Sequence, residues 1–184
     1  MTGRLPQMQA VILVGFMGAG KSSVGRVLAE HLGWTFEDLD DRIEEREKQT
    51  VAEIFRNAGE DGFRRAEREA LKELLHGLHS GAEKVIALGG GAFVEESNLR
   101  LIAAANFPTV FLDAAVEELW KRCRQQSESQ GLERPLLRSL QGFRELYEKR
   151  RPYYLRATLR QETDGMAVEE IAAELVQALG RVRK

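Results

Sequence analysis

The sequence is poor in cysteine and has no long apolar run. Its one cysteine, Cys123, cannot form a disulfide within the chain, so a reducing, cytoplasmic compartment is the expected setting. The apolar runs extend over a few residues only, far short of the ~20 that a membrane-spanning helix needs. Residues 1–9 also lack the apolar stretch of a secretory signal. We therefore expect neither a disulfide-stabilised scaffold nor a membrane partner.

An excess of basic residues is missing as well. The 27 lysines and arginines are outnumbered by 29 aspartates and glutamates, for a formal net charge of -2 at pH 7. Nucleic acids usually require a basic surface, so we expect no nucleic-acid partner. What is present is the profile of a globular protein, with 43% hydrophobic and 30% charged residues in a chain of 184. This length suits a single domain spanning residues 1–184.

Short apolar runs alternate with longer amphipathic stretches. The runs predict strands at 10–14, 34–39, 85–88, 109–112 and about 158–161. The amphipathic stretches predict helices at 21–32, 51–57, about 60–79, 140–151 and 168–179. Gly33 and Pro152 are placed to end helices, and Gly180 follows the last apolar stripe. Thr50 and Glu53 form a capping box. The alternation predicts an α/β fold whose parallel sheet is covered on both faces, with ligands beyond the carboxyl ends of the strands.

The sharpest motif is a glycine-rich segment between the first strand and the first helix. Residues 15–22 read Gly-Phe-Met-Gly-Ala-Gly-Lys-Ser and match G-x-x-x-x-G-K-[ST], the P-loop. Its glycines let backbone N–H groups turn onto a phosphate, and the following helix adds its positive N-terminus. Lys21 is expected to reach the β- and γ-phosphates, and the Ser22 hydroxyl to ligate Mg²⁺. The motif predicts nucleotide binding, but it leaves open a kinase, an NTPase motor or a switch.

Two aspartates, Asp38 and Asp40, stand where the second strand is expected to end. In an extended chain their side chains point the same way, with roots about 7 Å apart. One carboxylate can then serve a magnesium shell while the other faces an acceptor hydroxyl. The alternative is an acidic helix start, which suits Asp40 and the acidic residues after it. Asp38, at the end of a buried strand, has no evident structural role of this kind.

Three glycines, Gly89, Gly90 and Gly91, follow the strand expected at 85–88. Side chains are absent where something must approach the backbone closely, so the run favours a ligand wall. A flexible turn is the alternative, although one glycine would be enough for it.

Several arginines have two interpretations each. Arg64 stands three residues before Glu67 on a predicted helix, where the carboxylate can hold the guanidinium ready for a substrate carboxylate. A solvated charged face is the alternative. Arg134 lies in residues 125–137, which change abruptly from polar to apolar as a mobile lid would. An ordinary surface loop is the alternative there. Arg122 and Arg150 lie in basic helical segments that solvation or the helix dipole would also explain.

Taken together and in order, these motifs resemble the shikimate kinases, which belong to the nucleoside monophosphate kinase-like structural family. The resemblance rests on residues 15–22, 38–44, 60–67, 89–92, 134–137 and 150–154. It implies a three-layer α/β/α P-loop fold with a central five-stranded parallel sheet in the order 2-3-1-4-5. Within it, substrate-binding helices would occupy about 40–72 and a lid about 124–138. It also implies a monomer that transfers the γ-phosphoryl group of ATP to the 3-hydroxyl of shikimate, with one Mg²⁺, in aromatic amino acid biosynthesis.

The resemblance further implies a role for each matched residue. Those expected to bind ATP are Gly18, Ala19, Gly20, Lys21, Ser22, Ser23, Arg122 and Arg134. Those expected to bind shikimate are Asp40, Arg64, Gly89, Gly90, Gly91 and Arg150. Asp40, Lys21 and Arg134 would act in catalysis. Ser22 would ligate the metal, with Asp38 acting through water.

Two departures from the family pattern are mild. Leu39 stands where a small hydroxylated residue is usual, and Tyr153 stands where leucine is usual. Two rival interpretations remain at this point: another small-molecule kinase of the same fold, such as a gluconate kinase, and a non-catalytic nucleotide-binding module.

Overall fold

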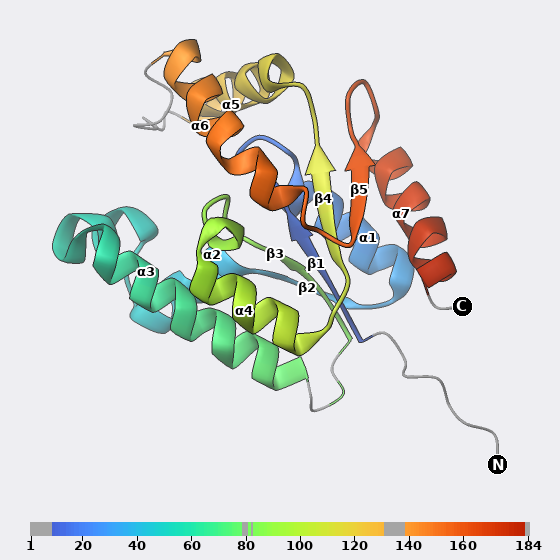
Figure 1. The fold of residues 1–184 in the computed structure, drawn as a ribbon, viewed down its shortest axis with the longest axis horizontal. Coiled ribbons are helices and arrows are strands. Elements are labelled where there is room, and N and C mark those ends of the chain that lie inside the picture. Colours follow the sequence, from blue (N-terminus) through green and yellow to red (C-terminus); the bar gives the residue numbers. More distant parts are fainter. Residues whose placement is uncertain (1–8, 79–80, 82, 131–138, 183–184) are drawn as a thin grey trace.

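The computed structural model describes residues 9–78, 81, 83–130 and 139–182. Five parallel strands form one sheet in the order β2-β3-β1-β4-β5 (Figure 1). The strands are β1 (Ala10–Val14), β2 (Thr35–Asp38), β3 (Lys84–Ala87), β4 (Thr109–Asp113) and β5 (Leu159–Glu162). The α/β class and the strand order expected above are therefore confirmed, and each predicted strand lies within one residue of the observed one.

The helices cover both faces of this sheet. They are α1 (Lys21–Leu32), α2 (Leu39–Glu47), α3 (Val51–Leu78), α4 (Glu96–Ala105), α5 (Val116–Gln130), α6 (Leu140–Tyr154) and α7 (Val168–Val182), with a short 3₁₀ helix at Ala92–Val94. Helices α1 and α7 pack against each other along one face, while α4 and the C-terminal part of α6 lie over the other (Figure 1). No helix within the described residues has the length and apolar character required to cross a membrane.

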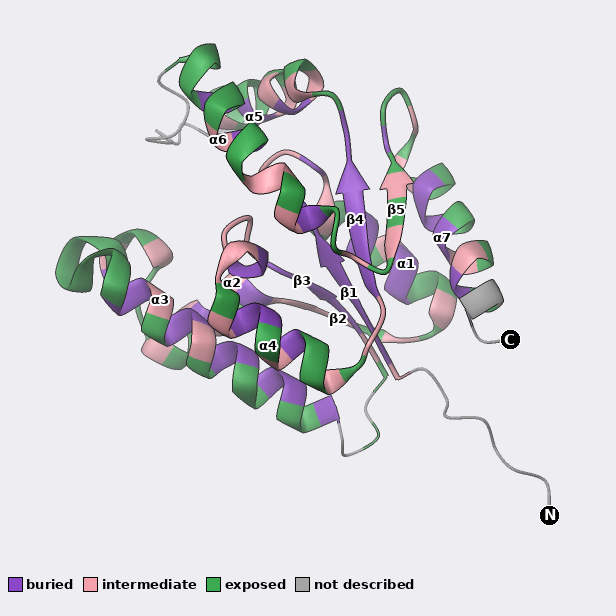
Figure 2. Ribbon diagram, in the orientation of Figure 1, coloured by how far each residue is buried: buried purple, intermediate pink, exposed green. Residues whose placement is uncertain are grey.

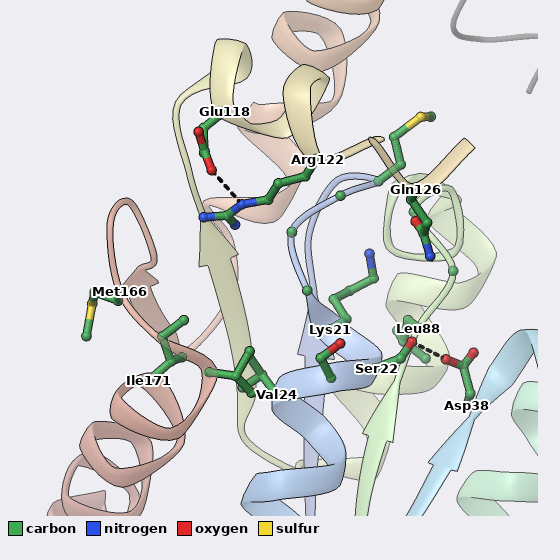
Figure 3. Close-up of a pocket in the computed structure, with 18 of the residues that line it drawn as sticks. Lys21, Ser22, Val24, Asp38, Leu88, Glu118, Arg122, Gln126, Met166 and Ile171 are labelled. Atoms are coloured by element: carbon green, nitrogen blue, oxygen red, sulfur yellow. Dashed lines mark hydrogen bonds and ion pairs between the residues drawn. The ribbon is translucent and has the colours of Figure 1, made fainter. Parts of the chain in front are cut away.

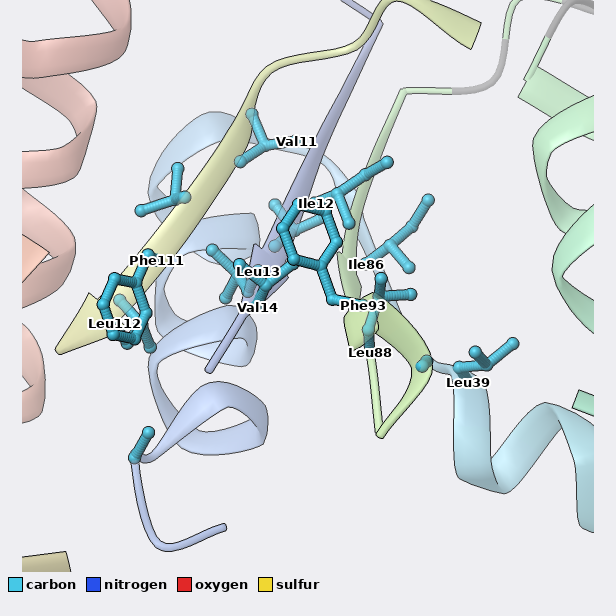
Figure 4. Close-up of a cluster of buried hydrophobic side chains, with 14 of the residues drawn as sticks. Val11, Ile12, Leu13, Val14, Leu39, Ile86, Leu88, Phe93, Phe111 and Leu112 are labelled. Carbon is cyan, nitrogen blue, oxygen red and sulfur yellow. The ribbon is translucent and has the colours of Figure 1, made fainter. Parts of the chain in front are cut away.

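The core lies in the middle of the sheet. Every residue of β1 and β4 is buried, whereas the edge strands β2 and β5 are partly exposed (Figure 2). Figure 4 shows Ile12, Leu13 and Ile86 of the central strands packed with Phe93 and Leu39. Leu39, one of the two departures noted in the sequence, is fully buried and fills core space. The rigid centre of the sheet thus holds the loops that follow β1, β2 and β3 in fixed positions.

Glycines and caps set several helix ends as predicted. Gly33 has φ 68° after α1, and its N–H donates to the carbonyls of Ala29 and Glu30. Thr50 and Glu53 form the expected capping box at the start of α3. The two predicted helices on either side of Gly59 are joined there at a break, because Gly59 adopts φ 67° and ψ -172°.

Two predicted helix ends were wrong. Helix α6 continues through Pro152 to Tyr154, because a proline in the last turn removes one backbone bond whose acceptor, at Glu148, stands on an exposed turn. Helix α7 runs past Gly180, which does not adopt a left-handed backbone. Helix α4 was not predicted at all, although Leu99 and Ile102 are buried at helical spacing.

Candidate functional site

A cavity of about 690 Å³ opens at the carboxyl ends of the central strands (Figure 3). This volume is in the range of small-molecule sites. Its walls come from five parts of the chain: residues 17–24, Asp38 with Asp40, residues 88–90, Glu118 with Arg122 and Gln126, and residues 165–171. The cavity lies where parallel sheets bind ligands, and all but the last of these parts contain residues expected from the sequence.

The P-loop forms one wall. Gly15, Gly18 and Gly20 have φ of 145°, 79° and 84°, conformations that side chains rarely allow. A Cβ atom at Gly18 would lie 2.8 Å from the Cys123 sulfur, because α5 packs directly on the loop. The first turn of α1 contains no acidic residue of its own, so the positive N-terminus of this helix can attract an anion.

Lys21 lies over this loop. Its Nζ donates to the carbonyls of Gly15 and Phe16, at 2.9 Å each. Burial lowers the pKa of Lys21 to about 8, although Asp40 and Asp38 raise it in part. The ammonium group is charged at neutral pH and stands where an anionic ligand would draw it from the carbonyls.

Asp38 connects the P-loop with α2. The Ser22 hydroxyl donates to Oδ2 of Asp38 at 2.6 Å (Figure 3). The Oδ1 atom of Asp38 accepts from the N–H of Asp40 at 3.0 Å. Asp38 therefore caps α2, a structural role that sequence analysis did not find. The extended geometry assumed for the two aspartates was also wrong, because the chain enters α2 immediately after Asp38. Both side chains nevertheless line the same cavity.

Asp40 is held in a poorly solvated position. Burial raises the pKa of its carboxyl group to about 6, and the charge of Asp38 adds to the effect while Lys21 opposes it. A carboxyl group with this pKa is ionised at neutral pH and still basic enough to accept a proton. The acidic helix start was the alternative for Asp40, and the residue does lie in the first turn of α2.

The triple-glycine loop brings the remaining side chains together. A Cβ atom on Gly89 would lie 2.8 Å from Oδ1 of Asp40, and one on Gly91 would lie 2.7 Å from Nη2 of Arg64. A Cβ atom on Gly90 would lie 3.6 Å from the N atom of Met17 in the P-loop and 3.8 Å from Nη1 of Arg150. The three glycines thus form the point where both arginines, Asp40 and the P-loop meet, which a flexible turn would not require.

Arg64 is fixed by a buried carboxylate. Its Nη1 donates to both oxygens of Glu67, at 3.1 and 3.0 Å, and Glu67 is 1% exposed. The Nδ2 of Asn98 donates to the same carboxylate at 3.3 Å and to the carbonyl of Ala92 at 3.2 Å. Burial raises the pKa of Glu67, while Arg64 lowers it in part. The predicted Arg64–Glu67 contact is confirmed, and the alternative of a solvated face does not hold for Arg64.

Arg122 lies across the cavity from these groups. Its Nε donates to Glu118 at 3.0 Å (Figure 3). Its Nη2 donates to the carbonyl of Thr163 at 3.2 Å, and the two bonds together fix the guanidinium plane. Met166 and Ile171 form the apolar wall on that side. Arg134 lies outside the described residues, as does the part of the predicted lid from 131 to 138; residues 124–130 belong to α5.

Sequence analysis missed several residues of the site. Glu118 lies one turn before Arg122 on α5 and Gln126 one turn after it, and the i, i+4 spacing of Glu118 and Arg122 was a usable signal. Met166 and Asn98 have no local pattern that marks them, because they reach the site only through the fold.

Comparisons with known proteins agree with this geometry. A family model described as shikimate kinase matches residues 17–180. The chain is 37% identical to a shikimate kinase of Persephonella marina, covering 96% of this chain and 100% of the relative. It is 40% identical to a shikimate kinase of Thermus thermophilus, covering 93% and 90%. The solved shikimate kinase of Acinetobacter baumannii, in complex with shikimate, superposes with a TM-score of 0.83 at 35% identity, covering 95% of this chain and 94% of that one. The chain belongs to the shikimate kinase family.

Proposed function

We propose that the protein transfers the γ-phosphoryl group of ATP to the 3-hydroxyl of shikimate, and that the two sides of the cavity divide the work. The observation that carries this proposal is the triple-glycine loop, around which Asp40, Arg64 and Arg150 gather beside the P-loop. A hydroxy acid needs such a set: paired cations for its carboxylate and a base for its hydroxyl.

The donor side consists of the P-loop and α5. The backbone amides of Gly18, Ala19, Gly20 and Ser23 hold the phosphates with the N-terminus of α1, and Lys21 neutralises the charge of the transferred group. Arg122, fixed by Glu118 and Thr163, packs its flat guanidinium against the adenine ring. Arg134, on the predicted lid, reaches the phosphates when the lid closes.

The residues present fit one Mg²⁺ ion. Ser22 and Asp38 already face each other at 2.6 Å, and both bear oxygen atoms, the ligands that Mg²⁺ prefers. Among the residues that the structure describes, no group of three acidic, histidine or cysteine side chains forms a metal cage. Such a cage is not needed, because Mg²⁺ at a nucleotide keeps several waters and takes one or two protein ligands. Ser22 would hold the ion directly and Asp38 through water, and the bound ion would supply charge neutralisation at the phosphates.

The acceptor side consists of α2, α3, α6 and the glycine loop. Arg64 and Arg150 hold the carboxylate of shikimate, and Gly89, Gly90 and Gly91 let the ring approach the backbone. Asp40 orients the 3-hydroxyl and accepts its proton as the new O–P bond forms and the bond to the β–γ bridging oxygen breaks, releasing ADP. Exclusion of water from the closed site prevents loss of the phosphoryl group to hydrolysis.

A substrate panel tests this proposal. ADP release is measured by a coupled assay with shikimate, gluconate and nucleoside monophosphates as acceptors. We expect turnover with shikimate alone. Turnover with gluconate instead would assign the chain to another kinase of the same fold, and no turnover with any acceptor would favour a nucleotide-binding module.

A further inference from the structure

Tyr154 is buried at the C-terminal end of α6. Its side chain is 0% exposed, and its ring packs on Phe111 of β4 with 5.3 Å between the ring centroids. Hydrophobic burial alone would account for an aromatic ring here, and phenylalanine would supply it equally well. What needs an explanation is the hydroxyl.

The hydroxyl of Tyr154 donates a hydrogen bond to the backbone carbonyl of Gly90, 64 positions away in the sequence. Burial raises the pKa of Tyr154 to about 12, although the nearby charge of Arg150 lowers it in part. The phenol therefore keeps its proton throughout the neutral range and is a constant donor. It ties the end of α6 to the middle of the triple-glycine loop.

The atoms around Gly90 make this tie important. Gly90 lies between the P-loop and Nη1 of Arg150, and its neighbours Gly89 and Gly91 contact Asp40 and Arg64. Arg150 stands one helical turn before Tyr154 on α6. A shift of Gly90 would thus alter the distances between the P-loop, the base and both arginines.

We propose that Tyr154 is a positioning residue for the acceptor side. Its hydroxyl fixes Gly90 against the turn of α6 that carries Arg150. This inference rests on the proposed function, since it takes Arg150 and the glycine loop as contacts of shikimate. Tyr154 itself touches no reacting atom. Its hydroxyl sets the spacing at which the substrate is held.

The test compares two variants of the full chain, Tyr154→Phe and Tyr153→Phe. The first removes one hydroxyl and keeps the ring on Phe111. The second removes the same group from the neighbouring, half-buried residue, whose hydroxyl makes no hydrogen bond to another of the described residues. We expect Tyr154→Phe to raise the KM for shikimate roughly five- to thirty-fold, which lies in the lower part of the range expected when a buried carbonyl loses its hydrogen-bond donor. The KM for ATP and the affinity for ADP should stay within about two-fold, and Tyr153→Phe should change neither constant.

Two outcomes would overturn the inference. An unchanged shikimate KM would mean that the hydroxyl does not position the substrate. A parallel loss of ADP affinity would mean that it supports the fold as a whole. Arg150→Lys separates these failures from a failure of the proposed function: if that variant leaves the shikimate KM unchanged, the assigned substrate site itself is wrong. In the double variant Tyr154→Phe/Arg150→Lys, the additional rise in shikimate KM caused by Tyr154→Phe should be smaller than in the intact protein, because Tyr154 acts through the position of Gly90 relative to Arg150.

Discussion

At Asp40, burial and the neighbouring charge of Asp38 act on one carboxyl group in the same direction. Together they raise its pKa to about 6, and Lys21 offsets them only in part. The same position that makes ionisation costly also makes the carboxylate a competent base at neutral pH. The role of Asp40 in turnover and its effect on the free energy of unfolding can be measured separately.

The first measurement is turnover as a function of pH. In the intact protein, kcat should fall as the pH drops through about 6, because protonated Asp40 cannot accept the hydroxyl proton. Asp40→Asn should lower kcat by roughly 10²–10⁴ and remove that limb of the profile, while ATP still binds. Near-normal turnover by this variant would mean that Asp40 is not the base.

The second measurement is stability without ligands. A carboxyl group whose folded-state pKa lies above its unfolded value of ~3.9 contributes stability that is present below pH ~4 and lost as pH rises through about 6. At pH 7 the ionised Asp40 should therefore cost roughly 1–3 kcal/mol. Asp40→Asn should raise the free energy of unfolding at pH 7 and change it little at pH 4, as measured by urea denaturation. An equal effect at both pH values would rule out ionisation as its cause.

The buried carboxylate of Glu67 holds the guanidinium group of Arg64 in one orientation. Arg64→Lys keeps the charge but loses the planar fork that Glu67 holds, so the KM for shikimate should rise by roughly ten-fold. Arg65→Lys is the matched control, because Arg65 is the exposed neighbour on the same helix. An effect of Arg64→Lys confined to the KM for ATP would contradict the assignment.

Single residues were predictable from the sequence where a motif fixes the backbone. The P-loop glycines and Lys21 belong to such a motif, and the structure brings them to one cavity. The role of Asp38 could not be predicted in this way. It caps α2 because β2 ends at this residue, and the sequence does not locate a strand end to within one residue. Asn98 was out of reach, since its contact with Glu67 joins α4 to α3 and neither segment encodes it locally.

At the scale of elements, Asp113 joins three of them. This residue ends β4 and is 4% exposed. Its Oδ1 accepts from the Tyr147 hydroxyl of α6 at 2.9 Å. Its Oδ2 accepts from Arg151 of α6 at 2.7 Å and from Arg160 of β5 at 2.8 Å. The helix that carries Arg150 is therefore anchored to the sheet through one carboxylate.

Asp113→Asn should lower the free energy of unfolding by about 2 kcal/mol, because a buried charged acceptor is lost while its arginine partners are partly re-solvated. Glu117→Gln is the comparison: it breaks an exposed 2.7 Å ion pair between Glu117 of α5 and Arg144 of α6, and it should change the free energy of unfolding far less than Asp113→Asn does. Urea denaturation of both variants decides the matter. Equal losses would show that burial of Asp113 does not set the strength of the anchor.

Elements were predictable to the extent that periodicity marks them. The fully buried β1 and the amphipathic α1 have unmistakable patterns, and both lie where the sequence indicated. The end of α6 does not lie where the sequence indicated. The expectation that a helix stops before a proline holds for an isolated helix, which has no tertiary contacts to support its last turn. Here the buried Tyr147 and Tyr154 on the same helix hold the last turn against the sheet despite the lost backbone bond.

Across the whole molecule, the proposed donor and acceptor sides meet at the triple-glycine loop but use separate side chains. ADP and shikimate should therefore each raise the melting temperature of the protein, because a ligand at one hundred times its Kd stabilises the folded state by about 2.7 kcal/mol. Arg122→Ala should weaken the effect of ADP and keep that of shikimate, and Arg64→Lys should weaken only that of shikimate. Thermal denaturation with each ligand measures this, and a variant that loses both responses would contradict a divided site.

The hydrogen bonds of Lys21 within the P-loop bear on how tightly a nucleotide is bound. The Lys21 ammonium group donates hydrogen bonds to two carbonyls of its own loop, those of Gly15 and Phe16. If Lys21 binds the phosphates as proposed, nucleotide entry is an exchange of partners, in which phosphate oxygens replace these two carbonyls. The affinity for ADP then reflects the difference in free energy between Lys21 bonded to the loop carbonyls and Lys21 bonded to phosphate. The loop can therefore keep its shape between turnovers, and ADP is not held too tightly to be released.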